Sequence, residues 1–307
     1  MKIINFILFF ACTLCATAQW ESVFIPEQGT DLHDVHLING EHGVAVGKLG
    51  TILMTDDGFH TWKRIACGTM KDFYALHFFD ATTAVVAGVG GTILRSTDGG
   101  NSWSSIISGT TDSLYKFSSL SSTSALLVGS NGTILKTIDK GLHWSSVPSG
   151  TTMSLLSISC KGSTCIATGK NGIILRSADR GESWKSIPSG TEVDLYTVSW
   201  VTNSTLLVGG DSSAIYRSSD AGASWQFDQN IFIMPDKRTS AEIFDIQFVN
   251  DSVGYMCGRL GSIGTFADYM DFGKIYFTKD TGKTWQRLVG TVYDSMLYKY
   301  DNQYSNA

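Results

Sequence analysis

The sequence predicts an all-β fold, and two observations support this prediction. A motif of the form Ser/Thr-x-Asp-x-Gly-x-x-Trp recurs six times, with one variant copy, and its aspartates are 41, 41, 40, 41 and 60 residues apart. The intervals contain alternating apolar runs, glycines and Gly-Thr pairs, a pattern typical of short strands joined by turns. Repeats of about 40 residues with four strands each indicate a β-propeller, in which radially packed sheets protect their edges.

The chain begins and ends with partial units around six complete ones. Residues 20–25 match a fourth strand, and Leu297 to Tyr300 match the first strand of a further unit. We therefore expect residues 19–307 to form one propeller domain whose termini supply a partial seventh blade. The pattern leaves open whether the ring has six blades with strands added at the closure or derives from a seven-bladed ancestor.

The motif aspartates are expected to stabilise the turns between third and fourth strands. A short carboxylate there can accept backbone hydrogen bonds, the glycine two residues later can adopt a positive φ, and the tryptophan can pack between sheets. Where Phe59 replaces this glycine, Gly58 is expected to take the positive φ instead. Because a catalytic site needs one constellation and a fold needs many copies, repetition favours a structural role. The aspartates are Asp57, Asp98, Asp139, Asp179, Asp220 and Asp280.

These repeats resemble a known family. The short motif is similar to the Asp-box, or BNR, repeats of sialidases and other propellers. The longer segment from Val89 to Trp103, with Gly-Thr-Ile-Leu-Arg-Ser-Thr-Asp-Gly-Gly-x-Ser-Trp, resembles the photosystem II assembly and stability factor family, which has secreted bacterial relatives. The resemblance spans residues 20 to 303. It implies the propeller fold and, for photosynthetic members, help in assembling a membrane complex.

The sixth unit is the candidate for a binding role, because it is longer than the others. Insertions at 226–242 and 259–274 are expected as loops on the face opposite the motif turns. Non-repeated loops on a rigid scaffold often carry function, and aromatic and charged side chains suit contact with a protein or a glycan. Solvated loops without a partner are the alternative. The candidate binding residues are Lys237, Arg238, Arg259, Phe266, Asp268, Tyr269 and Phe272.

The first strand of each unit is expected to line a central channel. Alternation with a period of two places Val35 and its counterparts toward the core. The candidate channel residues are Asp34, His36, His77, Lys116 and Asp245. His36 and His77 hold equivalent positions in adjacent units, so a metal or an acid–base pair is an alternative to an ordinary polar lining.

No catalytic set emerges from the motifs. Sialidase chemistry would require converging arginines, whereas the basic residues three positions before the motif aspartates lie on separate units and are expected to pair with acidic neighbours or to form a recognition strip. They are Arg95, Lys136, Arg176 and Arg217. A glycoside hydrolase would require two carboxylates about 5–10 Å apart. We therefore expect a non-catalytic binding or assembly platform without cofactor or metal, with a sialidase-like or glycoside hydrolase activity as the alternative.

Residues 1–18 have the features of a secretion signal, with Lys2, an apolar stretch and the small residues Ala16-Thr17-Ala18. The mature protein is expected to be a secreted or periplasmic monomer that binds a protein segment or a glycan. A net charge of -5 without charge blocks disfavours a nucleic-acid partner, and no later apolar run reaches the length of a membrane span. The short turn between Cys160 and Cys165 leaves open whether these cysteines form a hairpin disulfide.

Overall fold

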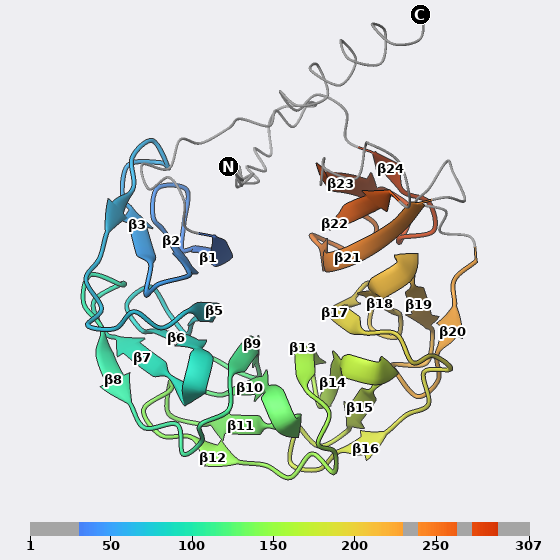
Figure 1. Cartoon of the computed structure of the whole chain (residues 1–307), viewed down its shortest axis with the longest axis horizontal. Helices are drawn as coiled ribbons and strands as arrows, with labels where there is room; N and C mark the ends of the chain where they lie inside the picture. The colour runs from blue at the N-terminus through green and yellow to red at the C-terminus, as the bar shows by residue number, and fades with distance from the viewer. Residues whose placement is uncertain (1–30, 230–238, 263–271, 288–307) are drawn as a thin grey trace, which may run out of the picture.

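The structure, a computed structural model, describes residues 31–229, 239–262 and 272–287. These residues form six four-stranded antiparallel sheets that follow one another around a central axis, each with its first strand innermost (Figure 1). We call the sheets blades 1 to 6 in chain order. The predicted all-β propeller of four-stranded blades is confirmed.

Within each blade the strands are paired in sequence order. Blades 1 and 2 comprise β1 (Leu32–Leu37), β2 (Gly43–Gly47), β3 (Ile52–Thr55), β4 (Lys63–Arg64), β5 (Phe73–Phe78), β6 (Ala84–Gly88), β7 (Ile93–Ser96) and β8 (Ser104–Ile106). Blades 3 and 4 comprise β9 (Leu114–Ser119), β10 (Ala125–Gly129), β11 (Ile134–Thr137), β12 (Ser145–Ser146), β13 (Leu155–Lys161), β14 (Thr164–Gly169), β15 (Ile174–Ser177) and β16 (Lys185–Ser186). Blades 5 and 6 comprise β17 (Leu195–Trp200), β18 (Leu206–Gly210), β19 (Ile215–Ser218), β20 (Gln226–Phe227), β21 (Thr239–Phe248), β22 (Gly254–Ser262), β23 (Phe272–Thr278) and β24 (Gln286–Arg287).

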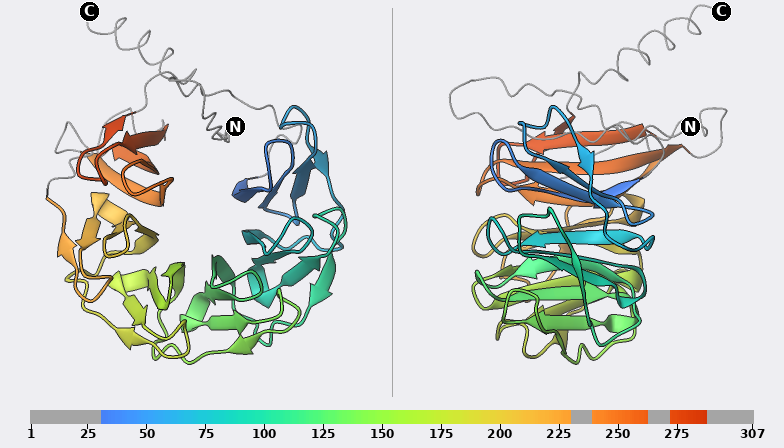
Figure 2. Two further views of the ribbon diagram at one scale, coloured as in Figure 1. Left: turned by 180° about the vertical axis from the view of Figure 1, so that it is seen from behind. Right: turned by 90° about the vertical axis from the view of Figure 1, so that its left-hand side faces the viewer.

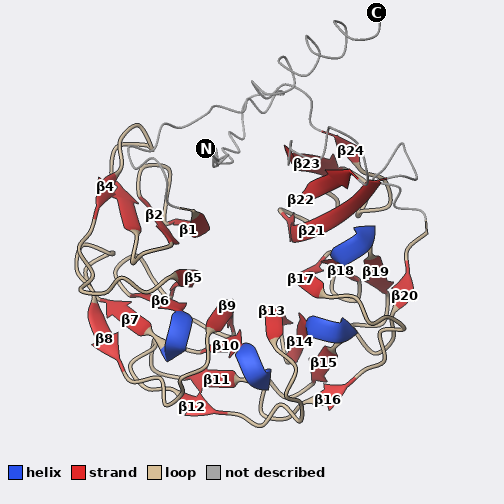
Figure 3. Cartoon of the chain, in the orientation of Figure 1, coloured by secondary structure: helices blue, strands red, loops and turns tan. Residues whose placement is uncertain are grey.

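The two faces of the propeller carry different connections. Because the strands are antiparallel, the turn between the first and second strands and the turn between the third and fourth strands of every blade lie on the same face. We call it the box face, because the Asp-box motifs form the turns between third and fourth strands. The opposite face, which we call the collar face, receives the links between blades and the turns between second and third strands. Four of these turns are short 3₁₀ turns (Figure 3), namely η1 (Val89–Gly91), η2 (Ser130–Gly132), η3 (Lys170–Gly172) and η4 (Asp211–Ser213).

The hydrophobic core consists of layers between consecutive blades. All residues of β10 are buried, with Leu127 packing against blade 2 and Leu126 packing against blade 4. Each such side chain contributes about 1.5–3 kcal/mol relative to exposure. Because both faces of the sheet are covered, the second strands are continuous apolar runs rather than alternating ones.

The motif tryptophans lie in these layers. Trp103, Trp144, Trp184, Trp225 and Trp285 each pack in the layer between their own blade and the preceding one. In blade 1 the motif tryptophan packs in a cluster with other residues of its own blade. The expected packing of the motif tryptophans between sheets therefore holds at five junctions.

Blades 1 and 6 stand at the two ends of an arc (Figures 1 and 2). The partial seventh blade and the secretion signal were predicted in residues 1–30 and 288–307, outside the described residues. Part of the insertion predicted as loop is strand, since β21 pairs with β22 from Thr239 opposite Ser262 onward. The blade extends further because the backbone of the inserted residues can continue the antiparallel ladder.

The structure resolves one question that the sequence left open. Cys160 and Cys165 lie directly opposite each other on β13 and β14 and form a disulfide. No helix among the described residues has the length and apolar character needed to cross a membrane.

Candidate functional site

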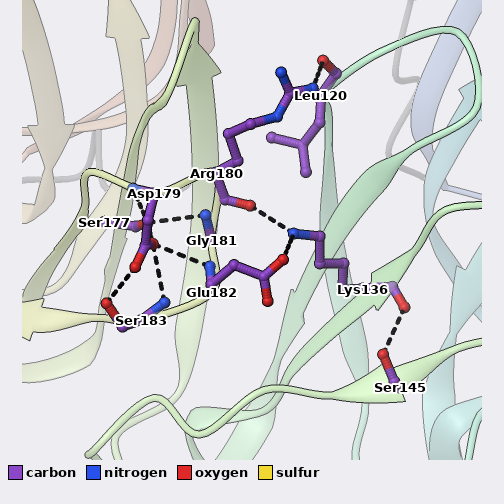
Figure 4. Close-up of polar contacts among 9 residues, drawn as sticks. All are labelled: Leu120, Lys136, Ser145, Ser177, Asp179, Arg180, Gly181, Glu182 and Ser183. Carbon is purple, nitrogen blue, oxygen red and sulfur yellow. Dashed lines mark hydrogen bonds and ion pairs between the residues drawn. The ribbon is translucent and has the colours of Figure 1, made fainter.

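The Asp-box carboxylates lie in six separate turns on the box face, and their contacts are local. Asp179 Oδ1 accepts hydrogen bonds from the backbone N–H groups of Glu182 (3.1 Å) and Ser183 (3.0 Å) and from the Ser177 hydroxyl (2.7 Å), as Figure 4 shows. Its Oδ2 accepts from the Ser183 hydroxyl at 2.5 Å. Equivalent bonds, led by that from the hydroxyl four residues after the aspartate, lower the pKa of Asp57 and Asp220 to about 2. The carboxylates therefore hold their own turns closed.

The variant copy of the motif corrects one expectation. The two residues that follow each box aspartate both adopt a positive φ. In blade 1 these are Gly58 (72°) and Phe59 (71°), so Gly58 does not take the positive φ in place of Phe59. Elsewhere the second position is glycine, because a Cβ at Gly141 would lie 2.5 Å from Cγ1 of Val85 in the preceding blade. In blade 1 the Phe59 side chain packs against Trp62 and is 4% exposed. This packing compensates for the left-handed backbone.

The basic residues before the motif connect neighbouring blades. Each donates to the backbone carbonyl of the residue after the box aspartate in the next blade. Lys136 Nζ donates to the carbonyl of Arg180 (2.9 Å) and to Glu182 (2.6 Å), and the Arg180 guanidinium donates back to the carbonyl of Leu120 at 2.9 Å (Figure 4). Acidic partners were expected for these residues, and Lys136 has one in Glu182. The acceptor that all four basic residues share, however, is a backbone carbonyl oxygen. The donors are Arg95, Lys136, Arg176 and Arg217.

Blade 1 lacks this connection, because Met54 stands where blades 2 to 5 have a basic residue. A cavity of about 350 Å³ lies at this place between blades 1 and 2, lined by Met54, Asp56, Asp98 and neighbouring residues.

Polar side chains of the first strands link adjacent blades near the axis. Asp34 Oδ2 accepts a hydrogen bond from the backbone N–H of Leu76 at 2.9 Å. Thr197 Oγ1 accepts from Ile246 N at 3.3 Å and donates to Asp245 Oδ1 at 3.1 Å. Three residues in the same alternating phase of the first strands as the predicted channel residues are buried, because the neighbouring first strands cover their small side chains; they are Ala75, Ser157 and Thr197.

The charged groups around the axis influence one another. The carboxylate of Asp34 raises the pKa of the half-buried Lys116, and Asp245 acts in the same direction. Burial lowers the pKa of His36 and lowers that of His77 to about 4. Both imidazoles are therefore neutral at pH 7.

The two histidines pack against aromatic rings. The ring centroid of His36 lies 5.0 Å from that of Phe78, and the centroid of His77 lies 4.7 Å from that of Phe79. His77 Nε2 is buried and has no hydrogen-bond partner among the described residues. Within residues 31–229, 239–262 and 272–287, no cluster of three or more His, Cys, Asp or Glu is placed to hold a metal ion.

A different set of residues forms a ring on the collar face. Every first strand contains a β-bulge, where the register against the second strand shifts by one. The bulge is at the second residue of the first strand in blades 1 to 5 and at Phe244 in the longer β21. A bulge leaves one residue outside the ladder and changes the direction of its side chain. We call the six bulge residues the collar: His33, Tyr74, Tyr115, Leu156, Tyr196 and Phe244.

The collar contains two aromatic arcs. Ring centroids lie 5.1 Å apart for His33 and Tyr74, 5.4 Å apart for Tyr74 and Tyr115, and 6.0 Å apart for Tyr196 and Phe244. Leu156 separates the two arcs along the chain. Phe244 is 46% exposed, and the other five members are partly exposed. Such partly exposed aromatic side chains are typical of binding surfaces.

Carboxylates accompany the collar tyrosines. Burial raises the pKa of Tyr74, and Asp72 raises it further. Burial likewise raises the pKa of Tyr196, followed by the effects of Asp211 and Asp194. The rings thus lie in a negative local field.

The predicted binding residues are placed only in part. Lys237, Arg238, Phe266, Asp268 and Tyr269 lie outside the described residues. Two others are in strands of blade 6: Arg259 in β22 pairs with Glu242, and Phe272 in β23 pairs with Leu260. Because Glu242 lies two residues before the bulge residue Phe244 in β21, this paired segment is continuous with the collar in blade 6.

Sequence reasoning missed the collar because strict alternation with a period of two does not allow for a bulge. A detectable signal was present. Aromatic residues recur at one phase, with spacings of 41 residues from His33 to Tyr74 and from Tyr74 to Tyr115.

Comparison with known proteins places this fold in a family. The sequence profile described as Photosynthesis system II assembly factor YCF48 matches residues 13–111 and 108–193, more than half of the chain. The chain belongs to the YCF48 family. The resemblance that the Asp-box repeats indicated is confirmed. No curated protein matches the chain significantly.

Solved structures of YCF48 are similar to this chain. YCF48 bound to a D1 peptide gives a TM-score of 0.70 at 20% identity, covering 93% of this chain and 87% of that one. YCF48 from Cyanidioschyzon merolae gives 0.68 at 22% identity, covering 89% and 88%. A GH74 enzyme from Niastella koreensis gives 0.60 at 15% identity, covering 83% of this chain and 46% of the enzyme. At these identities the similarity concerns the fold.

Proposed function

We propose that this YCF48-family chain is an exported, non-catalytic assembly factor that binds a segment of a partner protein on its collar face. The observation that carries the proposal is the collar itself. The bulges free six side chains from strand pairing, and aromatic members of adjacent blades lie within 5.1–6.0 Å of one another. The peptide-bound YCF48 structure supports a protein segment as the kind of ligand.

Two further observations support the remaining parts of the proposal. The Asp-box carboxylates are spread over six turns and are engaged in hydrogen bonds with those turns, which favours a structural role over catalysis. The disulfide between Cys160 and Cys165 suits an oxidising compartment, in agreement with the secretion signal expected in residues 1–18.

Site-specific photo-crosslinking tests the binding face. A benzophenone amino acid replaces Tyr115 in one variant and the exposed Lys185 on outer strand β16 in a control variant. After incubation with cell-envelope and culture-medium fractions of the source organism, the Tyr115 variant should form protein adducts that the Lys185 variant does not. Equal adducts at both positions, or none at Tyr115, would refute the collar as the binding site.

The non-catalytic part has its own test. The purified chain is incubated with xyloglucan and with a sialoside, and released reducing ends or sialic acid are measured. We expect no release above a heat-inactivated sample, and turnover of either substrate would contradict the proposal.

A further inference from the structure

We infer that the collar selects a segment carrying lysine or arginine side chains spaced by apolar residues. This inference rests on the proposed function and specifies the chemistry of the partner. It follows from the charges beside the collar, from the faces of its rings and from the apolar side chains around it.

Negative charge exceeds positive charge beside the two aromatic arcs. Four carboxylates act on the phenols of Tyr74 and Tyr196, against two lysines. Both lysines are already paired, Lys48 with Asp31 and Lys170 with Asp194. A bound cation would therefore meet the carboxylates of Asp72 and Asp211, which these two lysine pairs do not engage.

The carboxylates of Asp72 and Asp211 are fixed in place. Asp72 Oδ1 accepts a hydrogen bond from the backbone N–H of Leu49 at 2.9 Å, and Asp211 Oδ1 accepts from that of Ser212 at 2.8 Å. In each case a single carboxylate oxygen accepts this hydrogen bond, and an aspartate oxygen can accept more than one bond. These groups can therefore receive an incoming ammonium or guanidinium without losing their own turns.

The chain already places one of its own cations on a collar ring. Lys170 Nζ lies 5.9 Å from the centroid of Tyr196, within the range of a cation–π interaction. The other collar aromatic rings are partly exposed and offer the same chemistry to a partner. Aromatic rings flanked by carboxylates favour cations over neutral sugars, because both groups attract positive charge.

Exposed apolar side chains lie on the same face of the propeller. Met70 is 67% exposed on the link into blade 2, and Leu49 is 50% exposed in the β2–β3 turn. Exposed methionine adapts to varied apolar partners. The surface therefore combines sites for cations with sites for apolar side chains, which an extended segment alternating between the two would satisfy.

Fluorescence anisotropy with defined peptides tests this inference. The probes are a short labelled peptide alternating lysine with leucine, the same peptide with glutamate for lysine, and the same peptide with acetyl-lysine. For the whole chain we expect the lysine peptide to bind at least about tenfold more tightly than either of the others, with affinity that falls as salt rises.

Variants locate the preference. Asp72→Asn with Asp211→Asn keeps the two backbone acceptors and removes only charge, so it should abolish most of the preference for lysine. The control Asp251→Asn, on an exposed turn of the box face, should leave it unchanged. Circular dichroism confirms that each variant is folded.

The outcomes separate the two proposals. If the lysine and glutamate peptides bind equally and both require Tyr74 and Tyr196, the collar binds segments and the charge inference is overturned. Failure of the lysine peptide to bind the wild-type chain also overturns it, as does binding that survives both the charge variant and alanine at the two tyrosines. Loss of collar-specific crosslinking, by contrast, would refute the proposed function itself.

Discussion

The link between blades 3 and 4 makes a quantitative prediction for Lys136→Met. The Lys136 side chain is 11% exposed, and its ammonium donates to the carbonyl of Arg180 and to the exposed Glu182. Methionine keeps the unbranched stem and is the residue that blade 1 has at this position, Met54. The hydrogen bond of a charged donor is worth about 1.5–3 kcal/mol, and an ion pair with an exposed partner adds about 0–1 kcal/mol. Because Lys136→Met removes both, we expect the free energy of unfolding to fall by about 1.5–4 kcal/mol.

Equilibrium unfolding in urea measures this change. Lys185→Met serves as the matched control, because Lys185 is exposed on β16 and should change stability by less than about 0.5 kcal/mol. Glu182→Gln removes only the ion pair and should cost less than about 1 kcal/mol. A Lys136→Met variant as stable as the control would refute the reasoning. A Glu182→Gln variant as unstable as Lys136→Met would assign the effect to the ion pair rather than to the carbonyl.

Two further predictions concern the box turns and the axis. Asp179→Ala removes every hydrogen bond of that carboxylate and should lower the free energy of unfolding in urea by about 1–3 kcal/mol. Asp179→Asn keeps the Oδ1 acceptor and should lower it clearly less. Equal losses in the two variants would contradict the assignment of these hydrogen bonds to Oδ1. Since the pKa of His77 is lowered to about 4, the unfolded chain binds a proton below pH 6.5 that the folded chain excludes, so stability should decline by up to about 1.4 kcal/mol per pH unit between pH 6.5 and 4. The free energy of unfolding in urea, measured at pH 7 and at pH 5, should decline less in His77→Phe than in the wild type, whereas the exposed control His60→Asn should decline as the wild type does. An unchanged decline in His77→Phe would contradict the lowered pKa.

The repeated positions of the fold were readable from the sequence because each has the same neighbours in every blade. The motif tryptophans and the buried second strands recur because each blade packs against a copy of itself. Phe59 departs from the pattern for the same physical reason. Its side chain packs with its own blade where Gly141 faces Val85 of the preceding blade.

The candidate site was less accessible from the sequence. Asp34, His36 and Lys116 were placed correctly on the first strands, but alternation could not reveal that small residues such as Thr197 are covered there. A bulge adds one residue without leaving a signature in a period of two, so Tyr74 and its counterparts share the phase of the predicted core positions although their side chains are partly exposed. The partners of the basic residues were also hidden, because a backbone carbonyl in the next blade has no sequence signal.

The bulge explains how the collar residues can differ from blade to blade in a repeat protein. Most positions in a blade are constrained twice, by pairing within the sheet and by packing against an adjacent blade. A bulge residue is released from the first constraint, and its partly exposed side chain is largely released from the second. It can therefore change from His33 to Tyr115 to Leu156 without disturbing the blades. Six structurally equivalent positions can therefore carry different side chains, so the surface of the collar differs from blade to blade, with aromatic arcs on either side of Leu156. Recognition of a non-repetitive protein segment requires such a surface, and the Asp-box turns, with six similar copies, do not provide it.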